Sequence, residues 1–394
     1  MFENLKVSYF VVILSGLTGF IPMNAQHFRV GSVGSLKSTA FDSKSEILYT
    51  IFQDSIVAYS GFQFNQRNAY PIENTFPGFA DAYHPVITDS LLYFVEDNGG
   101  IVYLFTGDSL KRIDRSFDHR MQGASSMMVR NDTIFRYGGY GFWSNRNLIT
   151  FFSESSREWE IVIPHGKQEV PEGVNSAGMT NEANNTYLYG GYYRLPYELN
   201  DRTFYDKAWR FNWPEHKWEQ LGSLNQNFAL AKSHIDMGNR DLYYLSRRLL
   251  VVVDPSQNKV NHFTLPDSRF ENDCADGKCH VSNNLNARID GFYQDGNFYL
   301  PFFYPNTPEL PNSTGTLIYQ IIPESEFLLT LVGEEPLYFS DDFPWKKGGF
   351  LLVALSLLGG FIFVLRKKNS KIKFGYKTTG WFLGDSRCLW TLPP

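Results

Sequence analysis

One pattern recurs six times along the chain, at intervals of roughly fifty residues. Each copy has a short apolar segment, a polar turn and a second segment that carries an aromatic residue. Aligned on that residue, the copies place Tyr49, Tyr93, Phe135, Tyr187, Tyr243 and Tyr299 at equivalent positions, 44, 42, 52, 56 and 56 residues apart. Because a period of this length is typical of the blades of a β-propeller, the repeat constrains the fold more than any other feature.

The composition agrees with strands joined by tight turns. The chain holds 34 Phe, 23 Tyr, 8 Trp and 32 Gly; aromatic rings fit a pleated sheet, and glycine suits turns. Each copy continues into two further predicted strands, with Trp218 opening the fourth strand of one copy and Trp159 that of the preceding copy. Four strands in each of six copies predict a closed all-β ring over residues 26–340. Residues 26–34 are expected to add a strand to the last blade, which leaves no open edge.

Two of the copies carry a pair of adjacent glycines directly after the second strand, at 138–139 and at 190–191. With the following loop, aromatic strand, turn and tryptophan, residues 134–163 and 187–222 resemble the kelch repeat, and the other four copies match it loosely. The resemblance covers roughly residues 30–335 and implies a six-bladed kelch-type β-propeller. We expect the glycines to be structural, because a residue without Cβ permits close backbone approach and unusual φ values. We expect the tryptophans to pack between blades.

The two ends of the chain predict export and anchoring. Residues 7–21 form an apolar core behind Lys6 and before small residues, so residues 1–25 are interpreted as a secretory signal. Residues 348–365 carry no charge and are long enough to cross the roughly 30 Å of a bilayer core, which predicts a transmembrane helix over 346–365.

Charge fixes the expected orientation of that helix. Residues 346–394 carry 9 basic and 1 acidic side chains, a net charge of +8, and residues 26–345 carry 26 basic and 39 acidic ones, a net charge of −13. The basic tail, 366–394, is therefore predicted to lie in the cytoplasm, and the propeller outside the cytoplasm as a single-pass type I membrane protein. An acidic ectodomain argues against nucleic acid as a partner.

Cysteine and histidine usage points away from metals and cofactors. Cys274 and Cys279 are close enough to form a disulfide in an oxidising compartment, the alternative being two free thiols. Their spacing fits neither a zinc knuckle nor a haem site, and the eight histidines are scattered without the spacing of metal ligands. We therefore predict a disulfide, no metal and no cofactor.

The expected binding surface is the face that carries the connections between the second and third strands. The longest of these, 192–205, mixes aromatic residues with arginines, and its counterpart follows Gly139. Such a mixture suits recognition, although every propeller needs loops and exposed Tyr or Arg side chains are often only solvated. The candidate binding residues are Tyr140, Trp143, Arg146, Tyr192, Tyr193, Arg194 and Arg202.

These features favour a membrane-anchored binding or sensing module for a protein, peptide or glycan. The alternative is an extracytoplasmic sugar-active enzyme, similar to an epimerase or mutarotase, which would need arginines and carboxylates converging at one mouth of the channel. A third possibility is a scaffold that stabilises a membrane complex through its blade rims. Copper oxidases that resemble galactose oxidase need a crosslinked cysteine, which a Cys274–Cys279 disulfide would not leave free. No catalytic residue is assigned.

Overall fold

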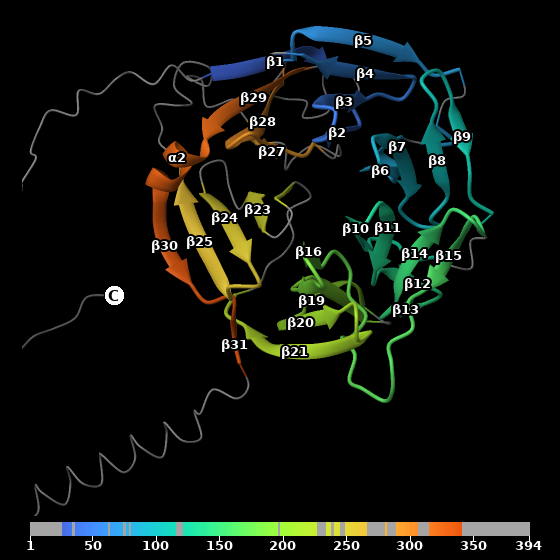
Figure 1. Ribbon diagram of the computed structural model, residues 1–394, viewed down its shortest axis with the longest axis vertical. Helices are drawn as coiled ribbons and strands as arrows, with labels where there is room; N and C mark the ends of the chain where they lie inside the picture. The colour runs from blue at the N-terminus through green and yellow to red at the C-terminus, as the bar shows by residue number, and fades with distance from the viewer. Residues whose placement is uncertain are drawn as a thin grey trace, which may run out of the picture. The chain divides into compact units, whose positions relative to one another are not determined.

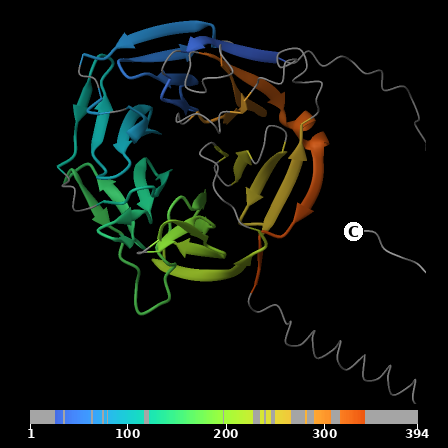
Figure 2. The same cartoon turned by 180° about the vertical axis from the view of Figure 1, so that it is seen from behind.

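The described residues form a ring of six antiparallel sheets, as Figures 1 and 2 show from the two sides. The computed structural model describes residues 26–340 apart from 34–35, 62–63, 74–75, 79, 116–120, 196–197, 227–233, 238–239, 245–248, 266–279, 282–288 and 306–314. Residues 341–394 belong to a separate unit. The predicted signal (1–25), transmembrane helix (346–365), basic tail and Cys274–Cys279 disulfide lie outside the described residues. Within them, no helix is long and apolar enough to span a membrane.

Each of the first five sheets takes its four main strands in chain order, from the ring centre outward. Blade 1 consists of β2 (Ser38–Asp42), β3 (Ile47–Ile51), β4 (Ser55–Ser60) and β5 (Gln66–Pro71). Blade 2 follows a short 3-10 turn (Ala80–Ala82) and consists of β6 (Tyr83–Thr88), β7 (Leu91–Glu96), β8 (Val102–Phe105) and β9 (Leu110–Arg112). Blade 3 consists of β10 (Ser126–Arg130), β11 (Thr133–Tyr137), β14 (Ile149–Ser153) and β15 (Glu158–Ile161). Blade 4 consists of β16 (Gly178–Glu182), β17 (Asn185–Tyr189), β20 (Lys207–Asn212) and β21 (Lys217–Leu224). Blade 5 consists of β22 (His234–Asp236), β23 (Asp241–Tyr244), β24 (Leu249–Asp254) and β25 (Lys259–Thr264).

The sixth sheet closes the ring with the N-terminal strand. Blade 6 consists of β27 (Phe292–Gln294), β28 (Asn297–Pro305), β29 (Gly315–Pro323) and β1 (Gln26–Val33), and β26 (His280–Val281) also pairs with β28. In the antiparallel pair of β1 and β29, Phe28 lies opposite Tyr319. Both side chains are buried, and the Tyr59 hydroxyl of blade 1 donates to the Val30 carbonyl at 3.1 Å. The expectation that residues 26–34 contribute a strand to the last blade is confirmed.

The repeated aromatic residues occupy one structural position in all six blades. Each is the third residue of its blade's second strand: Tyr49 in β3, Tyr93 in β7, Phe135 in β11, Tyr187 in β17, Tyr243 in β23 and Tyr299 in β28. Their neighbours along the strand are buried too, as Leu92 and Phe94 are on either side of Tyr93. A second strand therefore packs against both adjacent blades, which is why a strand such as β7 is apolar or aromatic at successive positions rather than alternately.

Glycines of both pairs lie against the connection that enters blade 4. Gly138, Gly139, Gly190 and Gly191 have φ values of 73°, 86°, 64° and 90°. A Cβ on Gly138 would overlap the carbonyl oxygen of Val174, and one on Gly191 would lie 2.7 Å from that of Asn175. Val174 and Asn175 lie in the connection that enters blade 4. The structural role expected for these glycines is confirmed.

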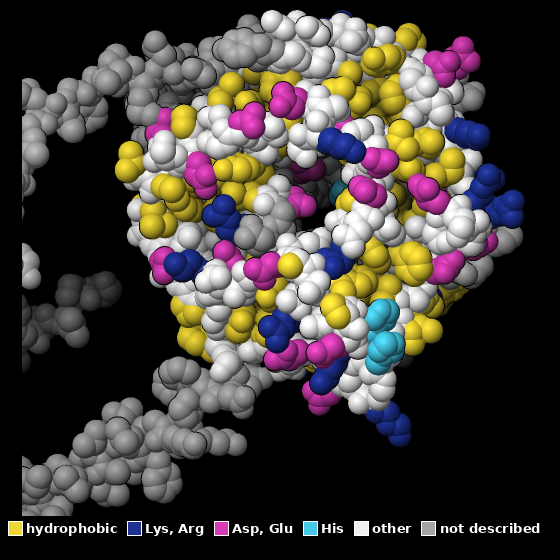
Figure 3. All heavy atoms as spheres, viewed as in Figure 1, with side chains coloured by type: hydrophobic (Ala, Val, Ile, Leu, Met, Phe, Trp, Pro, Cys, Tyr) yellow, Lys and Arg dark blue, Asp and Glu magenta, His cyan; other side chains and the backbone are white. Residues whose placement is uncertain are grey.

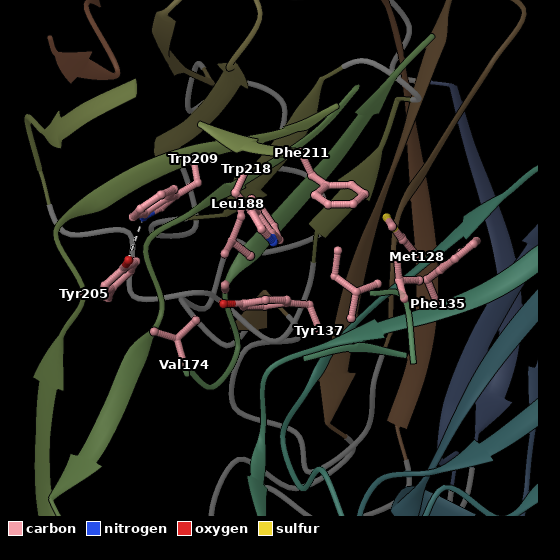
Figure 4. Packing of buried hydrophobic residues seen from close by; sticks show 12 residues of the cluster. Met128, Phe135, Tyr137, Val174, Leu188, Tyr205, Trp209, Phe211 and Trp218 are labelled. Atoms are coloured by element: carbon pink, nitrogen blue, oxygen red, sulfur yellow. Dashed lines mark hydrogen bonds between the residues drawn. The ribbon is translucent and has the colours of Figure 1, made fainter. Parts of the chain in front are cut away.

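The two tryptophans also pack between blades as expected. Trp218 of blade 4 meets Tyr137 of blade 3 with their ring centroids 5.7 Å apart, in the cluster that Figure 4 shows. Trp159 of blade 3 is 1% exposed, and its indole nitrogen donates to the Gly100 carbonyl of blade 2 at 2.6 Å. Each tryptophan thus joins its own blade to the preceding one.

The segment after blade 6 runs back along the outside of the ring, which the sequence did not lead us to expect. We call residues 324–340 the strap: α2 (Glu324–Phe327), a 3-10 turn (Leu328–Thr330), β30 (Leu331–Glu335) and β31 (Tyr338–Phe339). β30 adds a fifth strand to blade 5, and β31 adds a fifth strand to blade 4. Leu337 between them is fully buried, and Phe327 stacks on Phe263 at a centroid distance of 4.3 Å. The strap therefore ties together three consecutive blades.

Candidate functional site

Strand direction divides the connections of the ring between two faces. Because adjacent strands are antiparallel, the turns between strands one and two and between strands three and four of a blade lie on one face, which we call the turn face. The connections between strands two and three lie on the other, which we call the hairpin face. All seven predicted binding residues fall in connections of the hairpin face, in blades 3 and 4.

Those two connections are β-hairpins, not irregular loops. In blade 3, β12 (Tyr140–Gly141) pairs with β13 (Ser144–Asn145), and in blade 4, β18 (Tyr192–Leu195) pairs with β19 (Glu198–Phe204). Arg194 and Arg202 lie opposite each other in the second hairpin, and their side chains are outside the described part of the structure. The predicted residues are therefore held on regular backbone.

Asn175 joins the two hairpins. Its side-chain amide donates to Asn145 Oδ1 at 3.0 Å and to the Tyr192 carbonyl at 3.2 Å. Its backbone exchanges two further hydrogen bonds with Tyr192, of 2.7 and 3.0 Å. Asn175 is 1% exposed and was not among the predicted residues, because nothing in the local pattern marks an asparagine in a connection as a bridge. The structure thus brings the hairpins of blades 3 and 4 together on one surface.

The tip of the blade 3 hairpin presents two aromatic side chains to solvent. Phe142 and Trp143 are 51% and 85% exposed, at φ values of 50° and 67°. Two positive φ values in a two-residue loop define a type I′ turn, for which Asn-Gly is the preferred sequence. An L-residue in this conformation costs roughly 1–2 kcal/mol. The Arg146 guanidinium lies over the Phe142 ring, 5.3 Å from its centroid, as in a cation–π contact.

The predicted residues therefore divide into a tip and a base. Trp143 is at the tip. Phe142 is a second tip residue, which was not predicted from the sequence, and Arg146 lies over its ring. Tyr140, Tyr192 and Tyr193 are half-buried at the base of the hairpins, and Tyr193 packs against the core cluster between blades 3 and 4. The one sequence signal for the tip is a pair of adjacent aromatic residues between Gly141 and Ser144.

The centre of the ring is a cavity of about 410 Å³ lined by the innermost strands. Figure 3 shows the middle of the ring hollowed, with acidic side chains near the opening. The lining includes the carboxylates of Asp236 and Asp290 and the imidazole of His84, and its described residues include no arginine or lysine. No group of three or more possible metal ligands occurs in the described residues. The sugar-active alternative, which needs arginine beside carboxylate, stays a prediction.

A buried carboxylate lies between blades 4 and 5. Asp241 is 1% exposed, and its Oδ2 accepts hydrogen bonds from the hydroxyls of Thr180 and Tyr189 at 2.7 Å and of Tyr243 at 3.0 Å. Burial, together with the charge of Asp241, raises the pKa of both tyrosines well above 10. Because solvent does not reach these groups, the network joins blades and is not a candidate binding site.

Two grooves flank blade 3. The first, between blades 2 and 3, has a volume of about 380 Å³; we call it the acidic groove, and its lining residues are Thr88, Asp89, Leu91, Tyr93, Asp132, Thr133, Ile134, Phe151, Phe152, Ser153 and Glu154. The second, between blades 3 and 4, has a volume of about 660 Å³; we call it the apolar groove, and its lining residues are Thr133, Phe135, Phe151, Ile161, Val162, Ile163, His165, Trp213 and His216. Neither groove could be predicted from the sequence, because each one is assembled from two blades.

The acidic groove lies where turns of two blades meet. Asp89 and Asp132 lie in the turns between the first and second strands of blades 2 and 3, and Glu154 lies in the turn between the third and fourth strands of blade 3. Tyr93 donates to Glu154 Oε1 at 2.9 Å. Burial, followed by this hydrogen bond and the charge of Glu154, raises the pKa of the Tyr93 hydroxyl. The groove therefore belongs to the turn face, on the opposite side of the ring from the hairpins.

No protein-family model matches the chain, and no curated protein matches it significantly.

Proposed function

We propose that the chain is a membrane-anchored, extracytoplasmic kelch-type propeller that binds or senses a protein, peptide or glycan through the hairpin face of blades 3 and 4. The observation that carries this proposal is the Phe142–Trp143 tip. A turn that would be more stable as Asn-Gly holds two exposed aromatic side chains, with Arg146 against one of them.

The tip is an unfavourable arrangement for stability alone. Exposed apolar surface gains nothing from folding, and both residues adopt a backbone conformation that L-residues rarely take. Strained residues that persist on a regular scaffold commonly belong to binding or catalytic sites. Trp, Tyr and Arg also dominate the binding energy of interfaces, and these are the residue types gathered around the two hairpins.

The placement outside the cytoplasm rests on the sequence. The apolar core of residues 7–21, the uncharged run 348–365 and the basic residues after it support export and a single membrane anchor. The glycine pairs and inter-blade tryptophans support the assignment to the kelch type, since Gly138 lies against the connection that enters blade 4 and Trp159 binds the preceding blade.

The double substitution Phe142→Asn with Trp143→Gly tests the proposal. The variant installs the preferred type I′ sequence, so we expect thermal unfolding at a higher temperature, with a gain of roughly 1–2 kcal/mol. If the tip is a binding surface, the same variant of the full chain in detergent should lose the glycan-array or displayed-peptide ligands that the unmodified chain selects.

Leu329→Ser is the matched control, since Leu329 is 84% exposed on the strap. It removes an exposed apolar side chain far along the chain from the hairpins and should leave the selected ligands unchanged. Ligand binding that survives in the stabilised hairpin variant, or that is lost equally in the strap variant, would contradict the proposal.

A further inference from the structure

Three carboxylates converge on the acidic groove with no matching number of cations. Asp89 pairs with Lys44 of blade 1 at 2.9 Å, and both side chains are largely exposed. Asp132 Oδ1 accepts a hydrogen bond from the Asp89 backbone at 3.3 Å, and Glu154 accepts the one from Tyr93. Neither Asp132 nor Glu154 forms an ion pair within the described part of the chain. The groove therefore keeps a net negative charge.

A second observation is independent of this charge. Thr88 lines the groove and is only 6% exposed, and its hydroxyl oxygen has no hydrogen-bond partner. A buried hydroxyl without a partner carries a desolvation cost of about 1–3 kcal/mol. A ligand that donates a hydrogen bond at this position would remove that cost.

Part of the remaining lining is apolar. Leu91, Ile134 and Phe152 lie beside the carboxylates, together with the polar residues Thr133 and Ser153. Leu91 is 44% exposed although it is a large aliphatic residue. A ligand suited to this lining has a positively charged end and a short hydrocarbon chain.

The lining suits an organic cation better than a metal ion. No three possible metal ligands stand close enough together in the described residues to hold one. An ammonium group instead has three N–H donors that point in different directions. The groove offers three acceptors for them, which are the carboxylates of Asp132 and Glu154 and the hydroxyl of Thr88. At the rim, the protein places its own ammonium group, that of Lys44, against the third carboxylate.

We propose that the acidic groove between blades 2 and 3 binds a primary alkylammonium ion, of the kind carried by a lysine side chain or a small aliphatic amine. The ammonium group lies among Glu154, Asp132 and Thr88, and the alkyl chain lies against Ile134 and Phe152. The site is on the turn face, so this inference does not depend on ligand binding by the hairpins.

Calorimetric titration of the full chain in detergent tests the proposal. The probes are n-pentylamine for a free amine and Nα-acetyl-L-lysinamide for a peptide side chain, with n-pentanol as the neutral control. We expect saturable binding of at least one amine, weakened by added salt, and no binding of the alcohol. Tighter binding of the lysinamide would identify a peptide as the source of the amine. Tighter binding of pentylamine would identify a small molecule as its source. Alcohol binding as tight as that of both amines would overturn the proposal, and so would binding of Mg²⁺ or Ca²⁺ without either amine.

Substitutions that keep the shape of the groove locate the site. Glu154→Gln and Asp132→Asn keep an oxygen acceptor for their present partners, and each should weaken amine binding about 10-fold. Thr88→Val removes only the hydroxyl and should weaken it by a smaller factor. Glu215→Gln, in the equivalent turn of blade 4, is the matched control and should change nothing. Amine affinity that is unchanged in Glu154→Gln and Asp132→Asn, with unfolding midpoints as in the unmodified chain, would overturn the proposal.

One further variant keeps the test decisive if Glu154→Gln fails to fold. Lys44→Met removes an exposed side chain, and it leaves the carboxylate of Asp89 without its cation. The amine affinity should therefore rise. A fall in affinity, or no change, would contradict the placement of the ammonium group beside these carboxylates.

Discussion

The two grooves that flank blade 3 use equivalent positions for different chemistry. Tyr93 and Phe135 are each the third residue of a second strand, and Glu154 and Trp213 are each the first residue after a third strand. Between blades 2 and 3 the Tyr93 hydroxyl donates to Glu154 at 2.9 Å. Between blades 3 and 4 the rings of Phe135 and Trp213 meet at 4.9 Å. The repeated blade fixes where these side chains meet, and the residue types decide what the groove can bind.

Blade 3 can differ on its two sides because its strands alternate. Ile134 lines the acidic groove and its neighbour Phe135 lines the apolar groove, as the two-residue period of a strand requires. One blade can therefore present a charged surface to one neighbour and an aromatic surface to the other. The repeat consequently predicts the fold but not a ligand.

The largest expected effect comes from substituting the inter-blade tryptophans on the two sides of blade 3. Trp159→Ala and Trp218→Ala each empty a buried site and should cost about 3–5 kcal/mol of unfolding free energy. Trp159→Ala should cost about 1 kcal/mol more, because the Gly100 carbonyl also loses its indole donor and Arg136 loses the ring 5.0 Å from its guanidinium. Urea unfolding of both variants measures this. A greater loss in Trp218→Ala would contradict the account.

A glycine substitution on the blade 4 side should have the next largest effect. Gly138→Ala combines a positive φ of 73° with overlap of the Val174 carbonyl oxygen, so we expect a loss of roughly 2–4 kcal/mol. Gly107 has a φ of 98° with nothing within 4 Å of an added Cβ, and Gly107→Ala should cost only about 1 kcal/mol. Equal losses of unfolding free energy in the two variants would show that blades 3 and 4 do not approach closely at Gly138.

The smallest expected effect comes from giving the acidic groove the residue type that the apolar groove has at the equivalent position. Tyr93→Phe removes the hydroxyl bound to Glu154 and should cost about 1 kcal/mol at neutral pH. Because the folded protein raises the pKa of Tyr93, its contribution to stability is full below pH about 10 and is lost as pH rises further. The variant should therefore lose less stability than the unmodified chain between neutral and strongly alkaline pH. Parallel losses for the two proteins in pH-dependent thermal unfolding would contradict this role.

Much of the fold could be predicted from residues whose role repeats. The six aromatic positions follow from a pattern that every blade satisfies to pack against its neighbours. The glycine pairs, Trp159 and Trp218 repeat in blades 3 and 4, and the N-terminal strand is expected because the ring must close. The hairpin face of blades 3 and 4 was predicted for the same reason, since the glycine pairs mark where its connections begin.

The remaining features depend on contacts that no local pattern encodes. Arg136 lies in an aromatic strand and is fully buried, with hydrogen bonds to Ser125 Oγ and to the carbonyls of Asp97 and Gln122. Burial lowers its pKa to about 10. The strap pairs with the outer edges of blades that precede it by about 70 to 115 residues. The acidic groove needs Asp89 and Glu154 on adjacent blades, and their proximity appears only once the blades are packed in order.

The two grooves exist only if six blades are arranged in one closed ring, and a cysteine crosslink tests this arrangement most directly. Glu46 of blade 1 and Gln294 of blade 6 are 248 residues apart in sequence, yet Gln294 Nε2 lies 3.5 Å from Glu46 Oε1. Long side chains that meet at their ends leave the two Cβ atoms too far apart for a direct disulfide. Glu46→Cys with Gln294→Cys should therefore be joined by a short bis-maleimide reagent, with the product identified by peptide mass spectrometry. Glu46→Cys with Asn184→Cys, which places the second thiol on blade 4, should not. A ring that is open or differently ordered would link the second pair as readily as the first, or would link neither.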